Sequence, residues 1–170
     1  KPHLDYARDM FLFSFYTRGM SFIDMAYLKK SDLKNGIITY CRRKTGQQLT
    51  VKWEKCMEDI IAKYGENTAT RYLLPIITNP CSDERPQYRN AICRINVALK
   101  EVAGLAGLNI PLTMHVARHC WASVAKSKNI PLSVISEGMG HDSEETTRIY
   151  LASLDTSVVD KANSLILKDF

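Results

Sequence analysis

Residues 114–150, MHVARHCWASVAKSKNIPLSVISEGMGHDSEETTRIY, contain three segments with helical signals. Met114 to Lys126 has helical character, and Pro131 to Glu137 predicts a short helix that stops at Gly138. Asp142-Ser-Glu-Glu145 has the spacing of a capping box and predicts that another helix begins there. The region therefore predicts helices joined by short turns.

Four polar side chains in this region are candidates for one site. His115 and Arg118 are three residues apart, so on a helix they share a face and can converge on one anion. His141 follows Gly140 at a predicted helix entrance, and Tyr150 lies at the far end of that helix. Each residue alone has a plain structural interpretation, but their order favours a functional one. A tyrosine hydroxyl, two imidazoles and a guanidinium can cleave and rejoin a phosphodiester without a metal.

The rest of the chain predicts more helices and one hairpin. Helices are expected over residues 7–16, after the capping-box spacing of Ser21 and Asp24, over 54–64 and over 88–105, with Thr113 as a cap for the helix from Met114 and a looser connection marked by Pro75, Pro80 and Pro86. Asn35-Gly36 predicts a turn, and the β-rich segments 37–41 and 49–53 flank a basic tip that is expected to reach outward. We therefore expect a mainly α fold with a small antiparallel sheet around residues 36–53.

The composition is that of an ordinary globular domain. Its 170 residues suit a single domain over 1–170, and a net charge of +5 suits a polyanionic partner without requiring one. No apolar run is long enough for a membrane span. The five cysteines are odd in number and contain no C-x-x-C pair, so we expect reduced cytoplasmic thiols.

Metal and nucleotide chemistry are the alternatives to a site made of side chains alone. His115 and His119 have the i, i+4 spacing of metal ligands, but Val116 stands where a zinc protease needs its glutamate. The sequence also lacks a phosphate-binding glycine loop of either common type. We therefore expect neither a metal nor a cofactor.

A longer set of residues carries a family resemblance. It consists of YTRGMSFIDMA (16–26), Lys44, His115, Arg118, His141 and Tyr150 in that order. Over nearly the whole chain this set resembles the catalytic domain of the tyrosine recombinases, the family of phage and transposon integrases. The stretch around Arg18 is most similar to integrases of Bacteroides-type mobile elements. The resemblance implies that fold, a metal-independent site-specific DNA recombinase, double-stranded DNA as partner, and a cytoplasmic, nucleoid-associated location.

The resemblance also implies a role for each residue. Tyr150 would attack the scissile phosphate to form a 3′-phosphotyrosyl link, and His115 would help it lose its proton. Arg118 would bind two non-bridging oxygens with its planar fork of donors. His141 would donate another hydrogen bond, and Lys44 on the hairpin tip would protonate the leaving 5′-oxygen. Lys44 also has a simpler interpretation as a phosphate-contacting or solvated turn residue.

The chain departs from the family at one arginine. The family's first arginine normally lies eleven residues before the aspartate found here at Asp32, which places it at Ser21. Arg18 is about one helical turn upstream, and we expect its long side chain to replace the missing guanidinium. Arg42 and Arg43, beside Lys44, are expected to contact the DNA backbone.

Two alternatives to a recombinase stay open at this point. One is a nicking and closing enzyme of the type IB topoisomerase kind, and the other is a DNA-binding module that lost activity with the arginine at Ser21. The apolar stripe from Val158 to Leu167 either docks onto a neighbouring protomer in a tetrameric synapse or packs on its own domain. The N-terminal domain usual in the family is not recognisable, and we expect the sequence to be a fragment.

Overall fold

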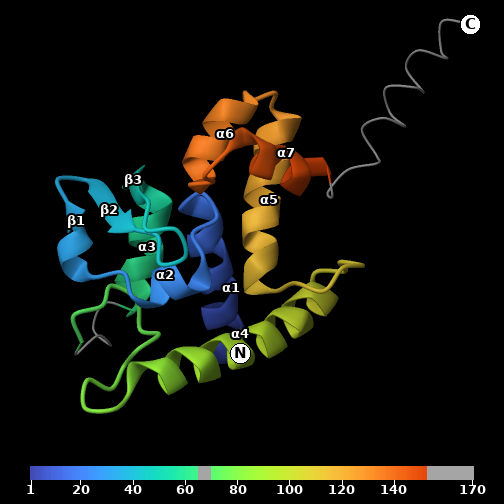
Figure 1. Cartoon of the computed structure of the whole chain (residues 1–170). Coiled ribbons are helices and arrows are strands. Elements are labelled where there is room, and N and C mark those ends of the chain that lie inside the picture. Colours follow the sequence, from blue (N-terminus) through green and yellow to red (C-terminus); the bar gives the residue numbers. More distant parts are fainter. Residues whose placement is uncertain (65–69, 153–170) are drawn as a thin grey trace, which may run out of the picture.

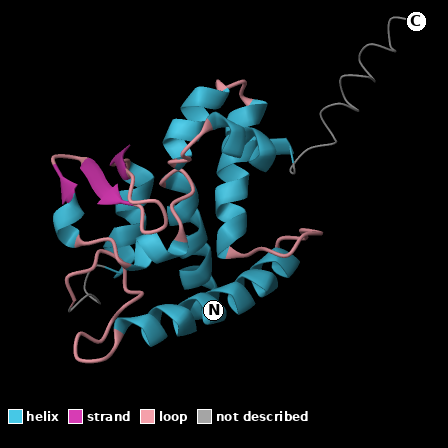
Figure 2. Ribbon diagram, in the orientation of Figure 1, coloured by secondary structure: helices cyan, strands magenta, loops and turns pink. Residues whose placement is uncertain are grey.

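The computed structural model describes residues 1–64 and 70–152, so the stripe from Val158 to Leu167 lies outside the described residues. In chain order the elements are α1 (Pro2–Tyr16), α2 (Phe22–Ala26), the 3-10 turn η1 (Lys30–Asp32), β1 (Leu33–Lys34), β2 (Ile37–Cys41), β3 (Gln48–Lys52), α3 (Lys55–Tyr64), α4 (Glu84–Leu105), α5 (Met114–Ser127), α6 (Leu132–Met139) and α7 (Glu144–Ala152). Figure 2 shows mostly helix with a small sheet at one edge, which confirms the predicted fold class.

Helix α1 is central because it contacts α3, α4 and α5. In Figure 1 the sheet and α3 lie to one side of α1, α5 and α7 lie to the other, α6 lies above its upper end, and α4 runs beneath it. The sequence of α1 explains this place, since Ala7, Met10 and Phe13 are all fully buried. A helix that is apolar on several sides is stable only when neighbours cover those sides.

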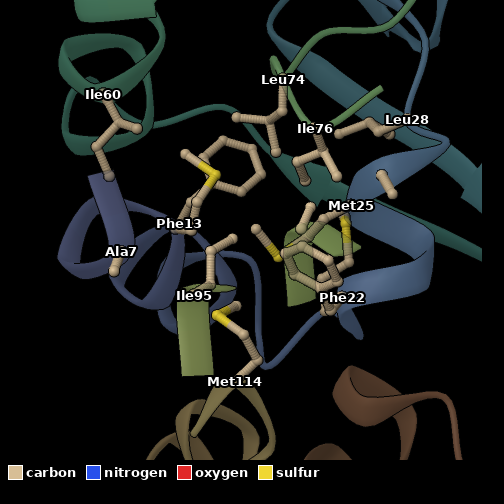
Figure 3. Close-up of a cluster of buried hydrophobic side chains, with 14 of the residues drawn as sticks. Ala7, Phe13, Phe22, Met25, Leu28, Ile60, Leu74, Ile76, Ile95 and Met114 are labelled. Carbon is tan, nitrogen blue, oxygen red and sulfur yellow. The ribbon is translucent and has the colours of Figure 1, made fainter. Parts of the chain in front are cut away.

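Two clusters of buried side chains hold the elements together. The larger one joins α1, α2 and α4 to the sheet and the start of α5, with Phe13, Phe22, Met25 and Ile95 among its members (Figure 3). Each fully buried side chain of this size contributes roughly 1.5–3 kcal/mol of burial free energy. The smaller cluster packs α6 and α7 on α5 and consists of Ala122, Ala125, Ile135, Met139 and Leu151. The C-terminal helices are therefore held by a core of their own.

The sheet is antiparallel and has the order β1-β2-β3. The predicted hairpin is confirmed, with Ile38 opposite Val51 and both side chains buried. The short strand β1 extends it across the predicted Asn35-Gly36 turn. At the other end, the backbone N–H of Arg42 donates to the carbonyl of Gln47 at 2.8 Å and closes the tip. The sheet thus presents the tip of the β2–β3 hairpin toward α6.

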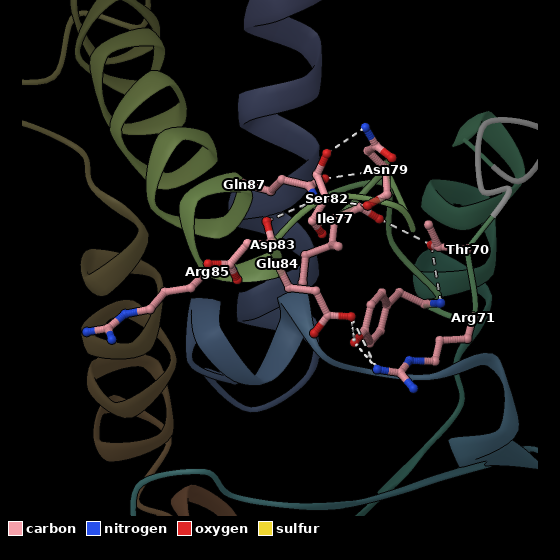
Figure 4. Close-up of polar contacts among 10 residues, drawn as sticks. Thr70, Arg71, Ile77, Asn79, Ser82, Asp83, Glu84, Arg85 and Gln87 are labelled. Atoms are coloured by element: carbon pink, nitrogen blue, oxygen red, sulfur yellow. Dashed lines mark hydrogen bonds and ion pairs between the residues drawn. The ribbon is translucent and has the colours of Figure 1, made fainter.

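Helix α4 begins earlier than the prolines suggested. It starts at Glu84 and includes Pro86 in its first turn, where a missing N–H costs no helical bond. Asp83 caps it by accepting from the backbone N–H of Arg85 at 3.1 Å. The side chain of Gln87 accepts from two backbone N–H groups of the preceding loop (Figure 4). The loop before α4 is therefore tied to the first turns of the helix.

Three other predicted helix ends need correction. Helix α1 begins at Pro2, before the predicted start. Helix α6 continues through Gly138 and ends at Met139, with Gly140 as its C-terminal cap. Helix α7 is capped by Ser143, whose hydroxyl accepts from the N–H of Thr146 at 3.3 Å, and not by Asp142.

The remaining caps agree with the sequence in position. Ser21 caps α2 as predicted, because its hydroxyl accepts from the N–H of Asp24 at 3.3 Å. Thr113 occupies the cap position of α5, although its side chain makes no capping hydrogen bond. Over the described ranges, none of the helices combines the length and the apolar character needed to cross a bilayer.

Candidate active site

The site is built around the C-terminal end of α6. The N–H of Gly140 donates to the carbonyl of Glu137, and that of His141 donates to Ser136, each at 3.0 Å. This pair of bonds is the Schellman arrangement, which a left-handed residue permits, and Gly140 has φ +63°. A side chain on Gly140 would also collide, since its Cβ would lie 2.8 Å from a methyl of Leu49.

Two arginines donate hydrogen bonds to backbone carbonyls at the end of this helix. Arg118 donates from Nη2 to the carbonyl of Met139 at 2.6 Å, and Arg42 donates from Nη1 to the carbonyl of Gly140. The last carbonyls of a helix have no partner within the helix and carry partial negative charge, so they attract cations. Neighbouring carbonyls therefore bring two guanidinium groups together.

Arg118 also fixes the turn between α1 and α2. Its Nη1 donates to the carbonyl of Gly19 at 2.8 Å, and the residue is only 8% exposed. The backbones approach so closely that a Cβ on Gly19 would lie 2.8 Å from the Arg118 Cα. Glycine at position 19 is therefore required by contact as well as by its φ of +72°.

A buried carboxylate positions the hairpin tip. Asp24, 5% exposed, accepts from the Ser21 hydroxyl at 2.6 Å and from the backbone N–H of Arg43 at 2.9 Å. The cap of α2 is therefore connected to the residue between Arg42 and Lys44. Sequence reasoning identified Asp24 only as part of a capping box and missed this role.

The basic tip divides into an inward and an outward part. Lys44 and Arg43 are exposed as expected, and the guanidinium of Arg43 lies 3.9 Å from the ring centre of Tyr27. The expectation that the tip reaches outward is wrong for Arg42, which is only 8% exposed. Its bond to the Gly140 carbonyl, 98 residues away, draws it toward α6.

Four aromatic rings lie in contact along α5 and α7. The ring of His119 lies 4.5 Å from that of His115 and stacks on Tyr150 at 4.7 Å with an interplanar angle of 3°. The ring of His141 meets Tyr150 edge-on at 5.6 Å, and its Nδ1 lies 2.7 Å from the buried Thr147 hydroxyl. Sequence reasoning considered His119 only as a metal ligand and missed Thr147. The i, i+4 spacing of the two histidines on α5 was the available signal for the first.

Burial, followed by the nearby positive charges, favours the neutral form of the histidines in the site. Burial and then the charge of Arg118 lower the pKa of His141 to about 4, with Arg42 and Lys44 acting in the same direction. The pKa of His115 is lowered by burial, then Arg118 and Lys44. The charge of Lys44 contributes to both shifts, and its expected role as the acid stays a prediction.

Tyr150 is held in its protonated form. Its hydroxyl oxygen is buried, and burial raises the pKa to about 12 while the charge of Arg118 opposes this shift. The pKa of Arg118 is itself lowered, by burial and then by Arg42. The site thus combines a protonated tyrosine with crowded positive charge, a combination suited to binding an anion.

Arg18 differs from Arg118 and Arg42 in its backbone conformation and in its neighbours. Its backbone is left-handed, with φ +61°, and its Cδ lies 3.7 Å from where a Cβ on Gly138 would stand. The ring of Trp121 lies against the same glycine. Burial raises the pKa of Tyr40 to about 12, and the charge of Arg18 opposes this shift, after those of Arg118 and Arg42. The expected contact of Arg18 with a phosphate stays a prediction.

The described ranges contain no group of three His, Cys, Asp or Glu side chains placed to hold a metal ion. His115 and His119 contact each other edge to face.

Replacing Gly140 with alanine should destabilise the protein by more than about 1 kcal/mol. The variant forces a Cβ into a left-handed position and against Leu49 and Arg42. Gly104→Ala on α4 is the matched control, because its Cβ would meet open space, and it should stabilise by about 0.5–1 kcal/mol. Urea unfolding measures both, and equal effects would contradict the proposed packing.

The pKa of His141 predicts a loss of stability in mild acid. In the unfolded chain the group titrates near 6.5, and in the folded chain at about 4. Between these values the unfolded chain binds more protons, so the free energy of unfolding falls as the pH falls from about 6.5 toward 4. His141→Gln should flatten part of this slope in denaturant titrations across that range. Parallel curves for the two proteins would refute the shift.

Comparison with known proteins places the chain in a family. The model of the phage integrase family matches residues 4–157. A search of curated proteins found no match.

Solved structures share the fold at low identity. XerA recombinase matches with a TM-score of 0.59 and 19% identity over 95% of this chain and 63% of that one. XerH bound to palindromic difH in a post-cleavage complex matches with a TM-score of 0.64 and 21% identity, over 93% of this chain and 45% of that one. The lambda integrase catalytic core matches with a TM-score of 0.50 and 14% identity, over 81% of this chain and 93% of that one. The chain therefore spans less than two thirds of XerA. With the family match covering most of its length, the chain belongs to the phage integrase family and has the fold of a tyrosine recombinase catalytic domain.

Proposed function

We propose that the chain is the catalytic domain of a site-specific DNA recombinase that cleaves and rejoins strands through a 3′-phosphotyrosyl intermediate on Tyr150. The observation that carries this proposal is the convergence of positive charge on Tyr150. The charge of Arg118 lowers the pKa of the tyrosine, and that of Arg42 lowers the pKa of Arg118. The charge of Lys44 lowers the pKa of His141, whose ring contacts Tyr150. A pocket with this charge stabilises a phosphate whose negative charge grows during attack.

The reaction conserves the energy of the bond that it breaks. The oxygen of Tyr150 forms a bond to phosphorus, the bond to the 5′-oxygen breaks, and the tyrosine proton passes to a base. His115 would accept that proton, directly or through His119, which contacts both rings. Lys44 would supply a proton to the departing 5′-oxygen. A second strand's 5′-hydroxyl reverses the step, so no high-energy cofactor is needed.

Neutral histidines suit these roles. A base must be unprotonated before attack, and the lowered pKa of His115 ensures this at neutral pH. For His141, an Nδ1 that accepts from the Thr147 hydroxyl leaves the ring proton on Nε2. That N–H would then be the donor to a phosphate oxygen.

Contacts with DNA away from the reacting phosphate would come from the basic tip. Arg43 is exposed beside the site, and the net charge of +5 favours a polyanion. The XerH structures are complexes with difH substrate, which supports double-stranded DNA as the ligand. Arg42 and Arg18 are candidates for contacts closer to the reaction. Action on such DNA would place the protein in the cytoplasm, with the nucleoid.

The rest of the assembly also belongs to the proposal. The chain spans 63% of XerA and 45% of the XerH complex protein, so the activity of a whole recombinase is part of this proposal. Self-association into a tetramer would use the segment from Val158 to Leu167. The likeness to Bacteroides-type integrases stays a prediction.

Replacing Tyr150 with phenylalanine should abolish a covalent protein–DNA adduct, because only the hydroxyl can attack phosphorus. Sequencing the junctions formed in cells supplies the target, and a nicked suicide duplex with that sequence traps the adduct for gel analysis. Tyr88→Phe is the matched control, since its ring stacks on Phe22 on the other side of the core.

Three outcomes of this experiment distinguish the candidate functions. An adduct that disappears in Tyr150→Phe, together with exchanged strands, supports the recombinase. An adduct with relaxation of supercoils and no exchange supports the topoisomerase-like alternative. The absence of an adduct in the unchanged protein leaves a DNA-binding module and refutes the enzyme.

Lys44→Ala should slow cleavage roughly 100- to 10,000-fold, the range for loss of a general acid. A duplex with sulfur in place of the bridging 5′-oxygen should restore the rate, because a thiolate leaves without a proton. Single-turnover cleavage of the two substrates measures the recovery. Arg43→Ala should weaken DNA binding without such recovery. Equal impairment of Lys44→Ala on both substrates would exclude it as the acid.

A further inference from the structure

Once the function proposed above is granted, a second guanidinium is missing from the position where the family keeps it. Ser21 stands there, and its hydroxyl is already engaged with the N–H and the carboxylate of Asp24. Arg118 alone would face a phosphate that gains negative charge in the transition state. The remaining question is which other side chain of this pocket neutralises the second oxygen.

Arg43 and Arg18 make other contacts. The guanidinium of Arg43 lies over the ring of Tyr27, 3.9 Å from its centre. The Cδ of Arg18 and the ring of Trp121 both lie beside Gly138. Neither of these contacts involves the carbonyls of Met139 and Gly140.

We propose that Arg42 is the second phosphate clamp and takes the place of the arginine that is missing at Ser21. Its side chain is buried and donates to the Gly140 carbonyl, next to the Met139 carbonyl that receives Arg118. The two guanidinium groups thus share the end of α6, immediately before His141. A guanidinium has five N–H donors, so the bond to Gly140 leaves others for a phosphate oxygen.

The surroundings of Arg42 favour an anion between the two arginines. Its charge lowers the pKa of both Arg118 and His141, so its charge lies close to both groups. Two buried cations repel each other, and an anion between them removes that cost. Arg118 would bind one non-bridging oxygen and Arg42 the other, while the tyrosine oxygen and the 5′-oxygen exchange places on phosphorus.

The position of Arg42 is fixed from three sides. Asp24 holds the following backbone N–H, the bond to Gln47 closes the tip, and Gly140 lies so close that its Cβ would be 2.9 Å from the Arg42 Cδ. A clamp must be held in place before the substrate arrives, and these contacts do so. The same contacts also allow a purely structural role, in which Arg42 only caps α6. The experiment must separate the two roles.

The test compares two scissile groups in the full chain. One suicide duplex carries the ordinary phosphate, and the other carries a methylphosphonate, in which a methyl group replaces one charged oxygen. On the ordinary duplex at saturating protein, Arg42→Ala should cleave roughly 100- to 1000-fold more slowly, the usual effect of losing one such donor. On the neutral duplex the deficit relative to the unchanged protein should shrink at least tenfold.

Control variants exclude a folding defect. Arg42→Gln keeps an amide that can donate to the Gly140 carbonyl, and it should show the same recovery with an unfolding midpoint close to that of the unchanged protein. Arg71→Ala removes an exposed arginine paired with Glu84, far along the chain from the site, and should cleave both duplexes normally (Figure 4). Arg18→Ala should show no selective recovery.

The outcomes bear separately on the two proposals. Equal deficits of Arg42→Ala and Arg42→Gln on both duplexes would reduce Arg42 to a structural cap. Selective recovery in Arg18→Ala would assign the clamp to Arg18 instead. The absence of an adduct from the unchanged protein would overturn the recombinase function, and the clamp with it.

Discussion

The buried guanidinium of Arg118 is the interaction on which the rest of the structure depends. Moving a cation out of water is costly, and a cation that cannot lose its proton must find hydrogen-bond acceptors. Arg118 finds them in the carbonyls of Gly19 and Met139, which belong to the turn after α1 and to the end of α6. The turn after α1 and the end of α6 are therefore fixed to one side chain. Removing it would leave both carbonyls and the surrounding pocket without their common partner.

The pocket around Arg118 contains several positive charges, and two of them, Arg118 and Arg42, are buried. Burial is the main cause of the lowered pKa values of Arg118, His115 and His141. The charge of Arg42 adds to the shifts of Arg118 and His141, and that of Lys44 adds to the shifts of the two histidines. Asp24 is the carboxylate that opposes the shift at Arg118. Such a pocket is less stable than an apolar one of the same size. The cost is understandable for a site that receives a phosphate, because the ligand supplies the missing charge. Tyr150, stacked on His119, lies in the same pocket, where burial raises its pKa to about 12 and the charge of Arg118 opposes this shift.

Sequence was sufficient where a single residue type determines the backbone. Asn35-Gly36 forms the predicted turn and Ser21 caps α2, because turns and caps depend on a few adjacent residues. It failed where distant contacts decide. Gly138 does not end α6, since the Schellman bonds form two residues later. The inward direction of Arg42 depends on a carbonyl 98 residues away, which no local pattern encodes.

Ser21 and Arg42, the arginine that we propose as the second clamp, are connected by hydrogen bonds through Asp24. Ser21 donates to Asp24, and Asp24 accepts from the N–H that follows Arg42. An arginine at position 21 could not donate this short hydroxyl bond or cap α2 in the same way. Position 21 thus holds a serine that helps to fix the hairpin tip through Asp24, in place of an arginine that would bind the phosphate directly. The two positions are coupled through one carboxylate, so changing either of them alters the placement of the other.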